Sequence, residues 1–141
     1  MVVWVANRNN PIPELNGSLK IDVHGKLNIL SSGNTILDLF GTNLVIENVS
    51  VTLLDYGNLV LQELYQDGPV KQVLWQSFDY PTNTLFPGMK LGINLKTGHT
   101  WSLTSWSSDQ LPAYGSFTLA GDLNGTDQLV IHKQRKHPLD K

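Results

Sequence analysis

Apolar residues alternate with polar ones in many short runs of this chain, and this period of two constrains the fold more than any other feature. The runs are residues 19–23, 27–29, 44–47, 51–54, 59–61, 101–104, 116–119 and 129–131. Clusters of Gly, Pro, Asn and Ser separate them. Short alternating runs between such clusters are typical of half-buried β-strands joined by turns. The pattern therefore predicts an all-β domain with almost no helix.

A weak internal repeat accompanies the alternation. Residues 19–30 and residues 51–62 each follow the order strand, glycine-containing turn, strand, and the turn glycines Gly25 and Gly57 are 32 residues apart. Repeated hairpin units of this size indicate a pseudo-symmetric β architecture. Two units alone do not choose between a prism, a set of propeller blades and a trefoil.

Composition excludes several classes of protein. The chain has 141 residues, 16 % charged and 40 % hydrophobic, with a net charge of −2 and no cysteine. These values fit one folded domain and argue against a disordered chain, a nucleic-acid binder and a disulfide or thiolate site. The basic stretch 132–137 is expected to be a solvated end. The sequence has no basic start followed by an apolar run and no apolar run of about 18 residues, so we expect neither a secretory signal nor a membrane span in it.

Sequence motifs of catalysis are missing. The chain has no Gly-x-Ser-x-Gly, no His-Glu-x-x-His and no calcium loop, and residues 92–99 are spaced as a turn rather than as a phosphate loop. The four histidines are scattered beside turn or tail residues, which favours solvated side chains over metal ligands; they are His24, His99, His132 and His137. We therefore predict that the chain is not an enzyme and holds no metal or cofactor.

Two long strings carry a family resemblance. Residues 3–12 read VWVANRNNPI and residues 74–92 read LWQSFDYPTNTLFPGMKLG, with shorter matches at 53–61, 103–106 and 115–117. Over about residues 3–131 the chain resembles the bulb-type (G-type) lectin domain of plant S-locus receptor-like serine/threonine kinases and S-locus glycoproteins. The resemblance implies a β-prism of three antiparallel sheets around a pseudo-threefold axis, with tryptophans in its core. We accordingly predict Trp4 and Trp75 as core residues.

The resemblance also implies a domain organisation and a location. It places the lectin domain at residues 1–106, lacking its N-terminal strands, and makes residues 107–141 its C-terminal strands and the start of a linker toward the S-locus glycoprotein region. Missing strands would leave a sheet edge open, so we expect a marginally stable or self-associating chain. The implied location is the extracellular face of the plasma membrane or the secreted space. The implied partners are a mannose-type glycan, a receptor ectodomain or peptide, or a second copy of the chain, with no nucleic acid.

Mannose-binding members of that family carry the site Gln-x-Asp-x-Asn-x-Val-x-Tyr, in which alternate residues of a strand share one face. In the first repeat none of the corresponding residues matches; they are Asp22, His24, Lys26, Asn28 and Leu30. In the second repeat, where the residues are Leu54, Tyr56, Asn58, Val60 and Gln62, only Asn58 and Val60 match. We predict a degenerate carbohydrate site at Tyr56, Asn58, Val60 and Gln62. A simpler interpretation makes Asn58 a turn residue after Gly57.

Three N-glycosylation sequons lie in or beside predicted turns and begin at Asn16, Asn48 and Asn124. Two functions remain open. The first is a carbohydrate-binding-type recognition module of a receptor-like kinase ectodomain, with the degenerate site above. The alternative is a protein- or peptide-interaction module that binds no sugar.

Overall fold

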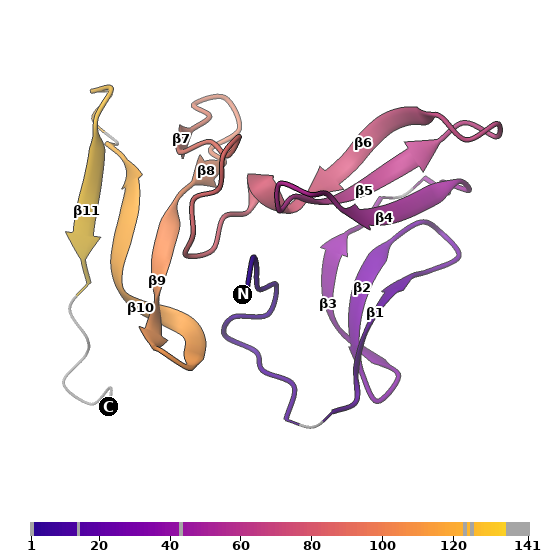
Figure 1. Cartoon of the computed structure of the whole chain (residues 1–141), viewed down its shortest axis with the longest axis horizontal. Helices are drawn as coiled ribbons and strands as arrows, with labels where there is room; N and C mark the ends of the chain where they lie inside the picture. Colours follow the sequence, from indigo (N-terminus) through magenta and orange to yellow (C-terminus); the bar gives the residue numbers. More distant parts are fainter. Residues whose placement is uncertain (1, 14, 43, 123, 125, 135–141) are drawn as a thin grey trace. The chain divides into compact units, whose positions relative to one another are not determined.

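A computed structural model describes residues 2–13, 15–42, 44–122, 124 and 126–134 (Figure 1). The chain forms two compact units, residues 10–77 and residues 1–9 together with 78–141. The described elements are β-strands, apart from one 3₁₀ turn, η1 (Ser77–Asp79). The all-β prediction is therefore confirmed. Across the described residues there is no helix long and apolar enough to cross a membrane.

The unit of residues 10–77 contains two three-stranded antiparallel sheets. The first has the order β1-β2-β3 and is made of β1 (Gly17–Ile21), β2 (Leu27–Ser31) and β3 (Asn34–Phe40). The second has the order β4-β5-β6 and is made of β4 (Val49–Leu53), β5 (Leu59–Leu64) and β6 (Val70–Gln76). The sheets are the purple and magenta ribbons of Figure 1.

The 32-residue repeat is a repeat of structure. Gly17 pairs with Ser31 at one end of the first hairpin, and Val49 pairs with Glu63, each 32 residues further on, in the second. The register stays equivalent along all five residue pairs of both hairpins. The two copies therefore share one hairpin geometry and differ only in their side chains.

Three turns of five residues, 22–26, 54–58 and 65–69, close the hairpins with one hydrogen-bond pattern. The first residue's N–H donates to the fifth residue's carbonyl, and the N–H of the glycine at the fourth place donates back to the first carbonyl, over 2.8–3.0 Å. These glycines, Gly25, Gly57 and Gly68, have φ values of 80°, 94° and 104°. Because only glycine adopts this left-handed backbone at little cost, it marks all three turns in the sequence.

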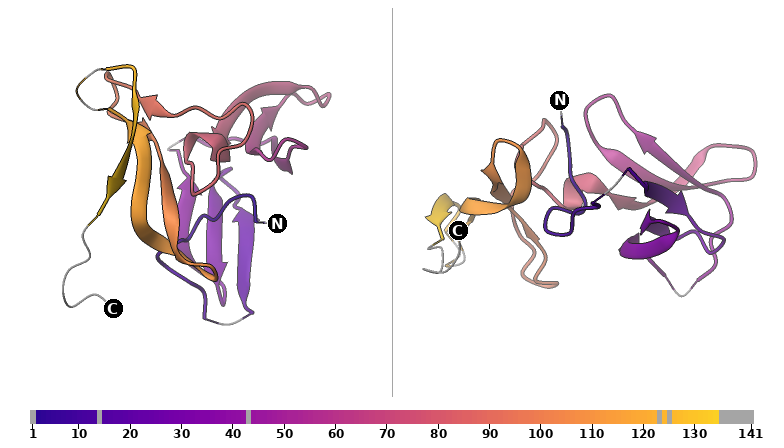
Figure 2. Two further views of the ribbon diagram at one scale, coloured as in Figure 1. Left: turned by 60° about the vertical axis from the view of Figure 1, so that its left-hand side comes forward. Right: turned by 90° about the horizontal axis from the view of Figure 1, so that it is seen from below.

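The other unit holds a three-stranded antiparallel sheet of order β11-β10-β9 and a short strand pair (Figure 2). Its strands are β7 (Gly92–Ile93), β8 (Thr100–Trp101), β9 (Leu103–Ser108), β10 (Leu111–Gly121) and β11 (Leu129–Lys133). The predicted boundary between residues 106 and 107 falls inside β9, and the division of the chain into a domain of 1–106 and a following segment stays a prediction.

Arg8 anchors the N-terminal segment to this sheet. Its guanidinium donates to the carbonyl of Pro112 over 2.7 Å and to the carbonyls of Thr104 and Ser105 over 2.8 Å each. The same group lies 4.8 Å from the ring centre of Tyr114. Arg8 is only 7 % exposed, and burial lowers the pKa of its guanidinium. The string of residues 3–12 thus serves the fold through a buried cation.

A cluster of aromatic side chains in the same unit joins Tyr80 of the second signature string to His99 and Trp101. His99 hydrogen-bonds the carbonyl of Asp79 through Nε2 over 2.6 Å, and its ring lies edge-on to Trp101 and Tyr80 at 4.5 and 5.3 Å between ring centres. Trp101 donates to Asp79 Oδ1 over 3.2 Å. His99 is half-buried here, whereas the sequence favoured a solvated histidine. Trp4 joins this region by donating from its indole N–H to the carbonyl of Tyr80 over 2.7 Å.

The best-buried apolar side chains are few: Leu27, Val60, Leu61, Trp75 and Phe78. Leu27 and Leu61 are fully enclosed, and Trp75 is 6 % exposed. Trp4 differs from Trp75 because it is half-buried. Elsewhere some strand predictions are wrong, and the short β7 within the predicted turn 92–99 is one of the strands that were missed. Residues 44–47 form no strand, and β3 and β6 went unpredicted.

Candidate functional site

The predicted sugar strip of the second repeat is divided between a turn and the start of β5. Tyr56 lies on the turn 54–58 and is 54 % exposed, and Gln62 is half-buried in β5. Asn58 and Val60, the two residues that match the family pattern, are only 4 % and 2 % exposed. The matching positions therefore offer almost no surface to a ligand.

The Asn58 side chain takes part in a hydrogen-bond network within the fold. Its amide donates to Gln76 Oε1 over 2.9 Å, and its Oδ1 accepts from the Ser77 hydroxyl over 3.4 Å. The same hydroxyl oxygen accepts from the N–H of Leu59 over 2.9 Å, and Ser77 is 1 % exposed. The network ties the beginning of β5 to the end of β6, which is a structural task.

In the first repeat the corresponding polar residues also stabilise their turn. The Asp22 carboxylate accepts from the N–H groups of His24 and Lys26 over 2.8 and 3.0 Å. Desolvation alone would raise the pKa of Asp22, but these two hydrogen bonds hold it below its usual value. Asn28 is buried, and its carboxamide lies between the carboxylates of Asp22 and Asp38. Neither strip presents a row of polar groups to the outside.

Two of the three sequons begin directly before an edge strand of a sheet, and the third lies in a connection between strands. Asn16 directly precedes β1 and is half-buried, whereas Asn48 directly precedes β4 and is exposed. Asn124 is exposed in the connection between β10 and β11, and residue 125 of its sequon lies outside the described residues. The sequons therefore differ in accessibility.

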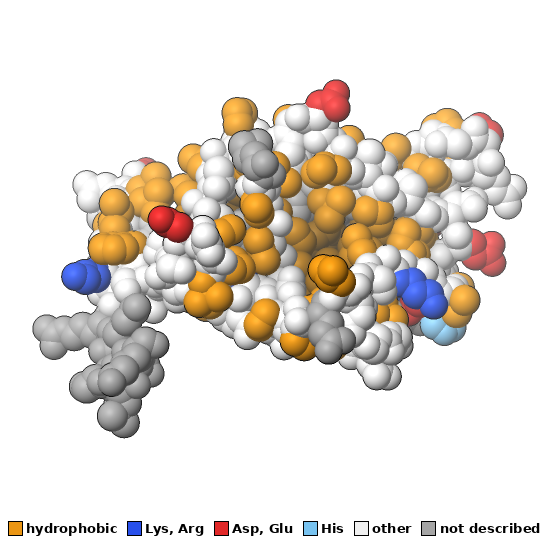
Figure 3. Space-filling model, turned by 60° about the horizontal axis from the view of Figure 1, so that its bottom comes forward, with side chains coloured by type: hydrophobic (Ala, Val, Ile, Leu, Met, Phe, Trp, Pro, Cys, Tyr) orange, Lys and Arg blue, Asp and Glu red, His pale blue; other side chains and the backbone are white. Residues whose placement is uncertain are grey.

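One face of the β11-β10-β9 sheet is open and mostly apolar, with the Lys133 ammonium 5.9 Å from the Phe117 ring centre at its end. Leu119 of β10 pairs with Ile131 and Leu103 on its two sides, and Phe117, two residues before Leu119, lies on the same face. Phe117, Leu129 and Ile131 are 49 %, 55 % and 71 % exposed. We call this surface, made of Leu103, Phe117, Leu119, Leu129 and Ile131, the apolar face. Hydrophobic side chains reach the surface at many places in Figure 3.

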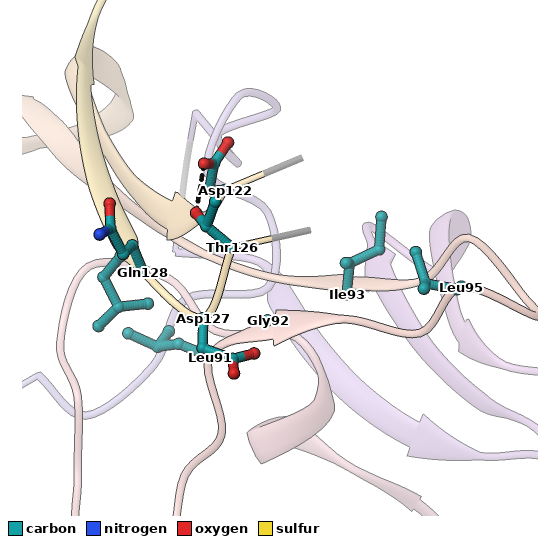
Figure 4. A pocket seen from close by; sticks show the side chains of 10 residues that line it. Leu91, Gly92, Ile93, Leu95, Asp122, Thr126, Asp127 and Gln128 are labelled. Atoms are coloured by element: carbon teal, nitrogen blue, oxygen red, sulfur yellow. Dashed lines mark hydrogen bonds between the residues drawn. The ribbon is translucent and has the colours of Figure 1, made fainter. Parts of the chain in front are cut away.

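A groove of about 420 Å³ adjoins the apolar face and shares Leu129 with it (Figure 4). It is lined by Leu91, Gly92, Ile93, Leu95, Gly121, Asp122, Thr126, Asp127, Gln128 and Leu129. Asp122 accepts from the Thr126 hydroxyl over 2.5 Å and from the N–H of Asn124 over 3.1 Å, and these bonds lower its pKa. The groove thus combines aliphatic walls with a rim of carboxylate and amide groups.

Sequence reasoning missed Arg8, the apolar face and the groove. Arg8 could have been noticed in the sequence because it stands in the string of residues 3–12, which begins with apolar residues. An arginine drawn into the interior with such a string needs hydrogen-bond partners there. The groove had no such signal, because β7 and the end of β10 meet only through the fold. The described residues contain no group of three or more His, Cys, Asp or Glu side chains that could hold a metal ion.

Comparison with known proteins places this architecture in a family. Residues 1–107 match the family model described as D-mannose binding lectin. The chain is 54 % identical over 129 residues to the G-type lectin S-receptor-like serine/threonine-protein kinase CES101 of Arabidopsis thaliana. The matched region covers 92 % of the chain and 15 % of that protein. It is 44 % identical over 120 residues to the S-locus-specific glycoprotein S6 of Brassica oleracea, covering 82 % of the chain and 27 % of that protein.

The chain therefore spans well under a third of the length of these relatives. The all-β fold of antiparallel sheets, the family model and the relatives all agree with the resemblance carried by the two signature strings. The predicted family is confirmed: this chain belongs to the bulb-type D-mannose binding lectin family, and over most of its length it is similar to plant G-type lectin receptor-like kinases and S-locus glycoproteins.

Proposed function

We propose that this chain is an extracellular recognition domain of a plant receptor-like kinase, and that its second-repeat strip has lost the binding of mannose-type glycans. The burial of Asn58 carries this proposal, because a carboxamide that is 4 % exposed and bonded to Gln76 has little left for a sugar hydroxyl. The relatives, named as receptor kinases and an S-locus glycoprotein, support the extracellular location.

The energetics of a single sugar site support the same conclusion. A millimolar site has a binding free energy of only about −4 kcal/mol. Each net hydrogen bond contributes about 1 kcal/mol, so loss of the family's Gln, Asp and Tyr groups removes about 3 kcal/mol. Burial of Asn58 and Val60 takes away most of what the strip would otherwise keep. Little affinity for mannose remains.

Titration of the chain with mannose and with oligomannose tests the proposal. We expect no saturable binding at millimolar sugar by calorimetry or by NMR shift changes. Saturable binding that disappears in Tyr56→Ala would contradict the proposal, since Tyr56 is the exposed member of the strip. Tyr65→Ala is the matched control, because Tyr65 is 52 % exposed on the turn 65–69 outside the strip.

A second candidate function, recognition of protein, is favoured by the apolar face. An open apolar patch beside a polar rim, which the groove supplies, is typical of protein interfaces. β11 is also an edge strand of its sheet, and among the described residues no strand pairs with its outer side. The occupant that we propose for this face is a second copy of the chain.

Sedimentation velocity tests whether the chain associates with a second copy of itself. We expect the average sedimentation coefficient to rise with protein concentration, and we expect Ile131→Lys to remove most of this rise by placing a charge on the apolar face. Val73→Lys is the matched control, because Val73 is 51 % exposed on β6 of another sheet. A concentration-independent monomer, or equal effects of both substitutions, would exclude self-association through this face.

A further inference from the structure

Asn16 and Asn48 occupy the same place in the two copies of the repeat. Each begins a sequon and directly precedes an edge strand, β1 in one sheet and β4 in the other. The carbonyl of Asn16 accepts from the N–H of Ser32 over 3.2 Å, and the carbonyl of Asn48 accepts from the N–H of Leu64 over 2.8 Å. The backbone is therefore matched, and any difference between the two asparagines comes from the side chains opposite them.

In the first copy two serines bind the asparagine side chain. Asn16 Nδ2 donates to the Ser32 hydroxyl over 2.6 Å, and the Ser31 hydroxyl donates to Asn16 Oδ1 over 3.3 Å. Asn16 is half-buried as a result. Its Nδ2, the atom to which an N-linked glycan is attached, is thus held against β2.

In the second copy Glu63 and Leu64 stand where the serines stand in the first. Leu64 has no hydroxyl, and the Glu63 carboxylate accepts from Gln72 over 2.6 Å and lies 3.5 Å from the Lys71 ammonium. Asn48 is exposed, and its carboxamide makes no hydrogen bond with the described residues of β5. Asn48 therefore has no counterpart of the two serine contacts that hold the Asn16 side chain.

We propose that Asn48 carries an N-linked glycan and that Asn16, despite its equal sequon, does not. The proposal rests on the extracellular location proposed above. A glycan on Asn16 would have to displace the hydrogen bonds of its side chain to Ser31 and Ser32. A glycan on Asn48 would displace no hydrogen bond to the described residues of β5. A bulky, soluble glycan at the start of β4 would also shield the open edge of that sheet.

Mass spectrometry of the secreted chain tests the proposal. The full chain is expressed behind a secretory leader in cultured human cells, with Asn124→Gln in every sample so that the third sequon cannot contribute. We expect one glycan that peptide-N-glycosidase removes. Asn48→Gln abolishes it, and Asn16→Gln leaves it unchanged. A glycan on Asn16, or an unmodified Asn48 in the secreted protein, would overturn the proposal.

A second comparison tests the physical cause. In a chain that carries Asn48→Gln and Asn124→Gln, the pair Ser31→Ala and Ser32→Ala removes both hydroxyls that hold Asn16. We expect a glycan to appear on Asn16 only when both serines are replaced, and an unmodified Asn16 would refute the role of the serines. The added leader directs the chain into the secretory route, and the glycan measurement involves no ligand. A negative result here can therefore be told apart from a failure of the proposed recognition function.

Discussion

Arg8→Ala is expected to lower the free energy of unfolding by about 3–5 kcal/mol, since each hydrogen bond to a buried charged group contributes roughly 1.5–3 kcal/mol. The substitution leaves the carbonyls of Thr104, Ser105 and Pro112 without their shared donor and removes the cation from the ring of Tyr114. Urea denaturation followed by tryptophan fluorescence measures the loss. A loss of this size takes a large part of the stability of a small domain.

Two further variants separate the geometry of Arg8 from its charge. Arg8→Lys keeps the charge but offers one ammonium where the guanidinium spans three carbonyls, so we expect it to recover only part of the loss. Lys20→Ala removes an exposed cation and should change the free energy of unfolding by less than about 0.5 kcal/mol. Equal stabilities for Arg8→Ala and Lys20→Ala would show that the segment 2–9 contributes nothing to this unit.

Gly115→Ala should cost about 3 kcal/mol, because overpacking at a buried site forces the backbone to move. A methyl group at Gly115 would overlap the carbonyl oxygen of Trp106 and the Ser105 hydroxyl, and would lie 2.8 Å from the carbonyl carbon of Trp106. That hydroxyl oxygen also accepts from the N–H of Phe117 over 3.2 Å, so the overlap disturbs the pairing of β9 with β10. The same denaturation measurement gives the value.

Gly41→Ala is the matched control for this effect. A methyl group there would meet only the flexible Lys26 side chain, at 3.8 Å, which is ordinary contact. We expect a change below about 0.5 kcal/mol. If Gly115→Ala were as mild as Gly41→Ala, the close approach of β9 and β10 at this point would be wrong.

Much of the fold could be predicted from sequence because its hairpins are local. The turns around Gly25 and Gly57 are encoded by a glycine that must adopt a left-handed backbone, and the strands beside them alternate cleanly. β3 and β6 were missed because bulges interrupt the register of both strands, and each extra residue shifts the alternation. Apolar and polar residues alternate over 44–47, but this segment forms no strand. Alternation shows only that a segment could form a strand, and pairing with a neighbouring strand is also needed.

The site was less predictable because burial depends on distant partners. The pattern placed Asn58 in a sugar strip, but its side chain is bound by Gln76 and Ser77, which lie 18 and 19 residues further along the chain. Gln76 is the last residue of β6, and Ser77 directly follows it. The difference between Asn16 and Asn48 likewise depends on residues across the hairpin. Local spacing identifies which side chains share a strand, and the rest of the fold decides which of them reach solvent.

The anchoring of the N-terminal segment has a consequence for synthesis on the ribosome. Hairpins such as those of residues 10–77 close in about 1–10 μs once their residues emerge. Arg8 cannot form its hydrogen bonds until the carbonyls of Thr104 and Pro112, 96 and 104 residues downstream, have been synthesised. At about 5–20 residues per second that delay is roughly 5–20 s. During this time the segment 2–9 stays without its sheet and is a place where a chaperone can bind the nascent chain.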